Sequence, residues 1–241
     1  MMKSDNYARN VAADMSIIHG KWAIGFVAVV LAVYIFVRLF NGEAETNTLV
    51  GRLILRLLRG EDLEDLQSGQ SGFLAFIHHP SKIFMLVCGI TSVSFLTFYV
   101  KQGVTRRDYF HGAAASSAAL ALFIPAVSGV VFAAEQLIFP PDIPPEPFRI
   151  ADWSVQCLSI LLYYAGGWLI GAGFYRSAPW GFAFIALSIV LAFGSETVWE
   201  AVQDGSWSLT VPISLATYVL AIGLTFWIVR LTTRRIRIKL K

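Results

Sequence analysis

Long apolar runs separated by short polar segments make up most of the chain. We predict six helical spans from them, at residues 22–40, 83–100, 112–139, 153–174, 180–193 and 209–231. The run from Ile83 to Val100 has no charged side chain, and the run from Gly112 to Phe139 has only Glu135. About 20 apolar residues in a helix cross a hydrocarbon core of about 30 Å. The pattern therefore predicts an all-α, polytopic membrane protein in which residues 1–241 form a single transmembrane domain.

The residues before the first span have an amphipathic pattern. Tyr7, Val11, Met15 and Ile18 recur at helical spacing, and the charged residues of this segment lie off that stripe. The pattern predicts a helix over residues 1–20 that lies in the membrane interface, with a frayed terminus as the alternative. The apolar run that follows is long enough to span and lacks a small-residue cleavage site, so we expect it to stay as the first span.

Two polar connections have patterns of their own. Between residues 49 and 60, large aliphatic residues form one helical face and Arg52, Arg56 and Arg59 lie opposite, with Gly60 placed to end the helix. We predict a second surface helix there, whose arginines are either solvated or in contact with anionic lipid or substrate. The prolines between residues 140 and 147 predict a stiff, extended turn.

Small residues gather where helices can pack closely. The third span begins with a run of alanines and serines at residues 113–119. Gly167 and Gly171, in the fourth span, are four residues apart, a spacing that permits close helix crossing. We expect helix packing at both places.

Composition excludes an ordinary soluble domain and gives no sign of metal chemistry. The chain is 56% hydrophobic and 15% charged, whereas soluble domains carry about 25% charged residues. Cys88 and Cys157 both lie in apolar runs, so we expect buried thiols in place of a disulfide or a metal site. The histidines fit no ligand spacing.

The distribution of basic residues predicts the orientation. With both termini in the cytoplasm, 13 of the 19 lysines and arginines lie inside, many of them in the tail after the sixth span. An excess of Lys and Arg in cytoplasmic segments is the rule that sets orientation. We therefore predict six spans with both ends cytoplasmic.

The polar segment at residues 101–111 separates the second and third spans and has helix-ending and helix-starting signals. Gly103 can end one helix, and Thr105 can cap a new one. Asp108 lies three residues after that cap, where a carboxylate favours a helix N-terminus. We predict a short helix near the membrane surface. A basic loop that only fixes topology is the alternative.

The sequence Gly103-Val104-Thr105-Arg106-Arg107-Asp108-Tyr109-Phe110 resembles the cytoplasmic loop of ABC-2 type transporter permeases. In that family this segment is the coupling helix, which docks into a cleft of the partner ATPase and transmits its opening and closing. The resemblance implies that residues of this loop couple the chain to an ATPase: Gly103, Thr105, Arg106, Arg107, Asp108, Tyr109 and Phe110. An interfacial helix at the N-terminus is also general in the family.

A second segment follows the fifth span and is rich in carboxylates. Glu196, Glu200 and Asp204 are spaced by four, so they would share one face of a short helix, and Trp199 suits a membrane interface. ABC-2 permeases resemble this too, with short re-entrant helices on the outer side between their last two spans. No nucleophile, base or metal ligand accompanies the carboxylates, so we do not expect catalysis.

The chain has no phosphate-binding loop of its own. Its only Gly-Lys pair, Gly20-Lys21, is followed by Trp22 in place of the Ser or Thr that such a loop needs. We therefore expect no enzyme activity and no cofactor in this chain, with ATP and Mg bound by a separate ATPase dimer.

The resemblance implies a permease subunit in a bacterial plasma membrane. It would pair with a second copy or a sister permease, and its partners would include membrane lipid but no nucleic acid. Because charge within the spans is scarce, an amphipathic or hydrophobic peptide, lipid or drug is the favoured cargo. The alternative is a non-transporting membrane assembly or sensor subunit that docks a cytoplasmic regulator.

Overall fold

The computed structural model describes residues 5–40, 73–138, 150–203 and 210–234, and the regular elements in this part of the chain are all helices. They are α1 (Asp5–Phe40), α4 (Phe73–Lys101), α5 (Arg106–Ile138), α6 (Ile150–Arg176), α7 (Ala178–Gln203) and α8 (Val211–Arg234). All 6 are long and apolar enough to cross a membrane. The all-α prediction is confirmed for the described residues, and these six helices agree with the six predicted spans in number, length and apolar character. The predicted surface helix at residues 49–60 and the proline-rich turn lie outside the described residues.

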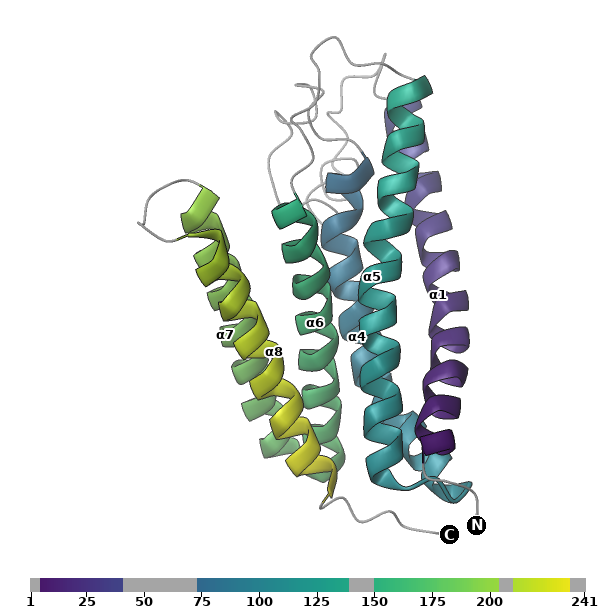
Figure 1. Ribbon diagram of the computed structural model, residues 1–241, viewed down its shortest axis with the longest axis vertical. Coiled ribbons are helices and arrows are strands. Elements are labelled where there is room, and N and C mark those ends of the chain that lie inside the picture. Colours follow the sequence, from purple (N-terminus) through teal and green to yellow (C-terminus); the bar gives the residue numbers. More distant parts are fainter. Residues whose placement is uncertain (1–4, 41–72, 139–149, 204–209, 235–241) are drawn as a thin grey trace.

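The helices form one elongated bundle (Figure 1). The start of α1, the connections α4–α5 and α6–α7 and the end of α8 lie at one end, which we call the turn end. The opposite end is called the far end. Both ends of the described chain therefore lie at the same end of the bundle. That this end is cytoplasmic stays a prediction.

Helix α6 lies at the centre of the bundle. It packs against α4 on one side and against α7 and α8 on the other, while α1 packs mainly on α5. In Figure 1 the α7–α8 pair leans away from the other helices towards the far end. The bundle thus has two parts, α1–α4–α5 and α7–α8, which both pack on α6, while α5 and α8 also touch each other directly.

Glycines bring the backbones of α4 and α6 into direct contact. A Cβ atom at Gly89 would lie 2.1 Å from the carbonyl oxygen of Tyr164, and one at Gly167 would lie 2.1 Å from that of Leu86. At Gly171 it would lie 2.7 Å from the carbonyl oxygen of Ile90. Since helices in lipid associate by close packing, small residues are what such a crossing requires. The close crossing that the spacing of Gly167 and Gly171 permits is therefore present, with α4 as the partner.

The core contains both cysteines and several large aromatic rings. Cys88 and Cys157 are free and buried, in agreement with the prediction. The largest fully buried side chains are aromatic, among them Trp168, Tyr109 and Tyr164. These rings lie towards the turn end, beside the segment that the sequence singled out.

Two predicted helix boundaries were wrong near the start of the chain. The predicted interfacial helix and first span form one continuous helix, α1, because Val11 and Met15 are buried in the core and hold its first turns to the bundle. Helix α4 begins at Phe73, not Ile83, and Pro80 lies inside it. The prediction placed this boundary at Lys82, whose charge is in fact paired inside the bundle.

Candidate functional site

The connection between α4 and α5 is a tight turn built by its own backbone. The N–H of Gly103 donates to the carbonyl of Val100 (3.1 Å), and the N–H of Val104 donates to that of Tyr99 (3.1 Å). Gly103 has φ of +88°, a left-handed conformation that favours glycine. These two bonds around a left-handed glycine make a Schellman motif, and the contact between Val104 and Tyr99 in the core completes it. The prediction that Gly103 ends a helix is confirmed.

Thr105 caps the helix that follows. Its Oγ1 accepts a hydrogen bond from the N–H of Asp108 (3.1 Å) and donates one to the Asp108 carboxylate (2.7 Å). The first bond is that of an N-cap, and the second, between the two side chains, holds the hydroxyl in place. The predicted cap is confirmed, but the predicted short helix is not a separate element. The cap starts α5 at Arg106, and this helix continues through Gly112 and past Pro125 to Ile138.

The residues of the turn divide into an exposed group and a buried group. Gly103, Thr105 and Arg107 are exposed, as are Lys101 and Gln102 beside them. Arg106 is half-buried, and its Nη1 donates to the backbone oxygen of Arg234 at the end of α8 (2.8 Å). The exposed residues are available to a partner, whereas Arg106 ties the turn to α8.

Tyr109 and Phe110 belong to the core. Tyr109 is 0% exposed, and its hydroxyl donates to the backbone oxygen of Ser92. The ring of Phe110 lies 5.4 Å from Trp168 of α6 and 6.2 Å from Phe226 of α8, between centroids. These two residues of the family-like motif therefore connect the turn to other helices and are not part of its outer surface.

The carboxylate-rich segment near the far end does not form a separate re-entrant helix in the described residues. Helix α7 continues past Phe193 to Gln203, so Glu196, Trp199 and Glu200 lie in its last turns, while Asp204 lies outside the described residues. Trp199 is half-buried against the α6–α8 contact, and Glu200 is exposed. The helix continues past the predicted end of the fifth span at residue 193 because a single helical glycine, here Gly194, costs only about 1 kcal/mol relative to Ala.

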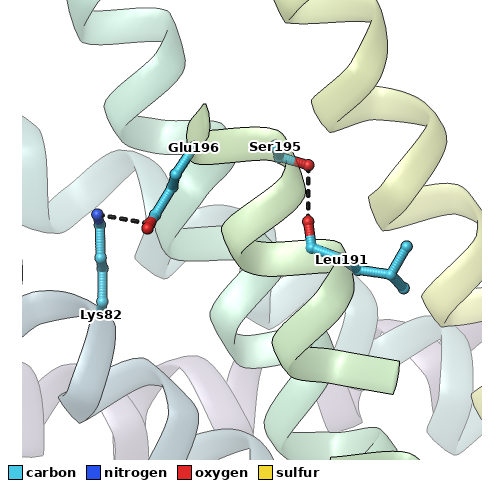
Figure 2. A network of polar contacts seen from close by, with 4 residues as sticks. All are labelled: Lys82, Leu191, Ser195 and Glu196. Carbon is cyan, nitrogen blue, oxygen red and sulfur yellow. Dashed lines mark hydrogen bonds and ion pairs between the residues drawn. The ribbon is translucent and has the colours of Figure 1, made fainter. Parts of the chain in front are cut away.

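Glu196 forms an ion pair that the sequence did not predict. Its Oε1 lies 2.6 Å from Nζ of Lys82 in α4, and Figure 2 shows the two side chains reaching towards each other. Lys82 is 7% exposed, and its Nζ also lies 5.7 Å from the ring centroid of Tyr163 in α6. The apolar residues at positions 73–77 were the signal that α4 begins earlier and that Lys82 lies within it.

A second carboxylate, the buried Glu135 of α5, links three helices at the far end. It accepts hydrogen bonds from the hydroxyl of Tyr34 in α1 and from the N–H of Phe73 (2.9 Å), the first residue of α4. A carboxylate at a helix N-terminus satisfies an otherwise free N–H and interacts favourably with the helix dipole. Glu135 thus has a structural role in the bundle.

The remaining chemistry gives no further indication of function. Among the described residues, no group of three or more His, Cys, Asp or Glu could hold a metal ion. No protein-family model, curated protein or solved structure matches the chain. Its function must therefore be inferred from its own residues.

Proposed function

We propose that this chain is the membrane-spanning permease subunit of an ATP-driven ABC transporter, an exporter of an amphipathic or hydrophobic substrate, coupled to a separate ATPase through the α4–α5 turn. The observation that carries the proposal is the construction of this turn. Exposed basic side chains stand on a rigid backbone whose next residues are buried aromatic rings in contact with α6 and α8.

A coupling element must move with its partner and must not absorb the motion itself. The Schellman motif at Gly103 and the cap at Thr105 close the turn on both sides, so only a few residues separate α4 from α5. A flexible linker would absorb a displacement, whereas packed elements shift together. A force on the turn would therefore reach both helices directly.

The packing of Phe110 gives such a force a path through the bundle. From α5 it leads to Trp168 in α6 and to Phe226 in α8, with the Arg230 guanidinium 5.8 Å from the Phe110 ring centroid. Arg106 adds a direct hydrogen bond to the end of α8. Motion of the turn would thus also displace α6 and α8, although the turn joins only α4 and α5 directly.

Charge at the turn end suits an acidic partner surface and anionic lipid. Lys101 and Arg107 are exposed on the α4–α5 turn, and Arg234, exposed at the end of α8, is tied to this turn by Arg106. Basic groups near a membrane surface are attracted by anionic headgroups, and a patch of one sign steers a partner of the opposite sign. The same charges would serve a sensor or assembly subunit, so only the identity of the partner separates the two functions.

The favoured cargo remains amphipathic or hydrophobic. Lys82 and Glu196 neutralise each other, so this pair does not favour a strongly charged ion. The exposed apolar side chains of α7 and α8, such as Phe193 and Trp227, suit lipid contact. A second copy or a sister permease completes the transporter, and ATP and Mg bind to the ATPase.

Co-purification tests the proposal. The tagged chain is co-expressed with the ABC ATPase encoded nearest to it, together with the double variant Lys101→Glu/Arg107→Glu. The control is Arg176→Glu, because Arg176 is an exposed arginine in the other connection at the turn end. Arg106 is left intact because its reversal would also break the contact with α8.

We expect the native chain and the control to retain the ATPase and the double variant to lose it. If the native chain retains no ATPase, the permease proposal is wrong. Specific retention of a non-ATPase regulator through the same turn would instead favour the sensor or assembly subunit.

A further inference from the structure

The Lys82–Glu196 pair joins two helices that do not otherwise approach each other. In the described residues, the backbone of α7 lies close to α6 and α8 but not to α4. The two side chains therefore reach around α6 to connect the α1–α4–α5 part of the bundle with the α7–α8 part (Figure 2). The distance of 2.6 Å between Nζ and Oε1 is that of a charge-assisted hydrogen bond.

At the turn end, α6 and α7 are joined in a different way. Only Ser177 separates them, and its N–H donates to the carbonyl of Gly173 while its own carbonyl accepts from Gly181 (3.0 and 3.1 Å). A Cβ atom at Gly173 would lie 2.9 Å from the carbonyl oxygen of Trp180. The two helices are thus fixed closely together at this point.

This arrangement has a fixed junction at one end, and nearer the other end the ion pair is the contact that links α7 to α4 in the described residues. Apolar side chains of α6, α7 and α8 also pack together there, among them Val155, Trp199 and Tyr218. In Figure 1 the α7–α8 pair diverges from the other helices towards the far end. If α7 and α8 rotated together about the junction at Ser177, their residues near the turn end would move least and those near the far end would move most. Lys82 and Glu196 lie beyond the middle of their helices in that direction, so the movement would separate them.

The burial of the pair suits a contact with two states. Lys82 is 7% exposed, and separation would leave this buried ammonium group without its partner charge. The paired state, in which Lys82 and Glu196 are in contact, is therefore favoured unless water or another polar group reaches both charges. The two charged groups can therefore separate only when other polar contacts replace the ones that they lose.

We propose that Lys82 and Glu196 form a latch that holds the α7–α8 pair against α4 and that opens when this pair swings about the α6–α7 junction. That the swing is part of a transport cycle rests on the proposed function. The latch itself is a property of this chain alone.

Distance measurements between spin labels test the latch in the full-length chain in lipid nanodiscs. Cys88 and Cys157 are replaced by alanine. One pair of labels, Ile83→Cys with Gln203→Cys, reports on the far end, and a second pair, Phe98→Cys with Phe182→Cys, reports on the turn end. All four labelled residues are exposed.

The test variant is Lys82→Met/Glu196→Gln, which removes the latch without leaving a buried charge unpaired and so should fold. The exchanged pair Lys82→Glu/Glu196→Lys keeps the attraction. Glu200→Gln, one turn further along α7 and exposed, is the matched control.

We expect the neutral double variant to gain a population with a longer far-end distance and an unchanged turn-end distance. The exchanged pair and Glu200→Gln should keep the native distribution. An unchanged far-end distance in the neutral variant would overturn the latch, as would equal changes at both ends. Because no ATPase is needed, the result is independent of whether the permease proposal succeeds.

Discussion

At the scale of single residues, a buried carboxylate, Glu135, and a half-buried one, Glu196, connect helices that are distant in sequence. Glu135 accepts from the Tyr34 hydroxyl and from the Phe73 N–H, and Glu196 pairs with Lys82. Buried charged groups are costly unless they are paired or fully hydrogen-bonded. Loss of the contacts of either residue should therefore lower the free energy of unfolding.

Replacement of Glu135 by Gln tests the first of these contacts. Gln is nearly the same size, but its neutral amide has one acceptor oxygen for two donors and no charge to place at the start of α4. We expect the free energy of unfolding to fall by about 1–3 kcal/mol, measured as a lower thermal midpoint in detergent. Tyr34→Phe, which leaves the Phe73 N–H satisfied, should cost less. Equal midpoints for native protein and Glu135→Gln would contradict this role.

Removal of one partner of the second contact should cost more than removal of both. Lys82→Met leaves Glu196 without its cation, and breaking a buried pair in this way typically costs about 3–5 kcal/mol. Lys82→Met/Glu196→Gln should recover most of the loss, as followed by thermal unfolding in detergent. A double variant as unstable as the single variant would mean that the charges do not depend on each other.

At the scale of elements, the bundle depends on glycine contacts and on well-terminated helices. The α4–α6 crossing brings backbones together at Gly89 and Gly167, and the α4–α5 turn is closed by Gly103 and Thr105. In both places one small or polar side chain decides whether the adjoining elements fit.

Substitution of Gly167 by Ala tests the crossing. The added methyl group would lie 2.1 Å from the carbonyl oxygen of Leu86, so the helices must separate. Overpacking of this kind costs about 1–3 kcal/mol or more. Gly223→Ala in α8 is the matched control, because nothing lies within 4 Å of its Cβ, and it should be neutral or stabilising by up to about 1 kcal/mol. Similar thermal midpoints for the two variants would rule out the close crossing.

Loss of the Thr105 cap should weaken the start of α5. Thr105→Ala removes the oxygen that accepts from the Asp108 N–H, which typically costs about 1 kcal/mol. Thr105→Ser keeps that oxygen and should retain most of the stability. Faster amide hydrogen exchange over residues 106–109 in the alanine variant, but not in the serine variant, would locate the effect. Equal exchange in both would show that the cap is unimportant.

The sequence predictions were correct where the interacting residues are close in sequence and failed where they are far apart. The cap at Thr105 and the stop at Gly103 depend on residues within one turn, and both were predicted correctly. Tyr34 and Phe73 lie 101 and 62 residues from Glu135, and Lys82 lies 114 residues from Glu196, so no local pattern could identify these contacts. The start of α4 at Phe73 and the end of α7 at Gln203 lie beyond the predicted bounds at residues 83 and 193, because Lys82 and Glu196 are paired with each other and do not end the helices.

At the scale of the whole molecule, the arrangement of the helices predicts which connections face the same side of the membrane. The α4–α5 turn lies at the turn end, and Thr210, just before α8, lies at the far end. With a membrane across the bundle, these two positions face opposite compartments. The excess of basic residues predicts that the turn end is cytoplasmic.

Cysteine labelling tests this orientation. Gln102→Cys and Thr210→Cys are made separately in a chain without Cys88 and Cys157, and both positions are exposed. A membrane-impermeant thiol reagent should label Thr210→Cys from outside intact cells and Gln102→Cys only in inverted vesicles. Labelling of both positions from the same side would contradict the six-span arrangement.

The most direct test of the coupling role is ATP hydrolysis by the chain reconstituted in lipid with its ATPase. We predict that Lys101→Glu/Arg107→Glu brings hydrolysis to the rate of the ATPase alone, while Arg176→Glu keeps the rate of the native complex and all three chains insert equally. If the double variant hydrolyses ATP at the native rate in a complete complex, the α4–α5 turn does not couple the bundle to an ATPase.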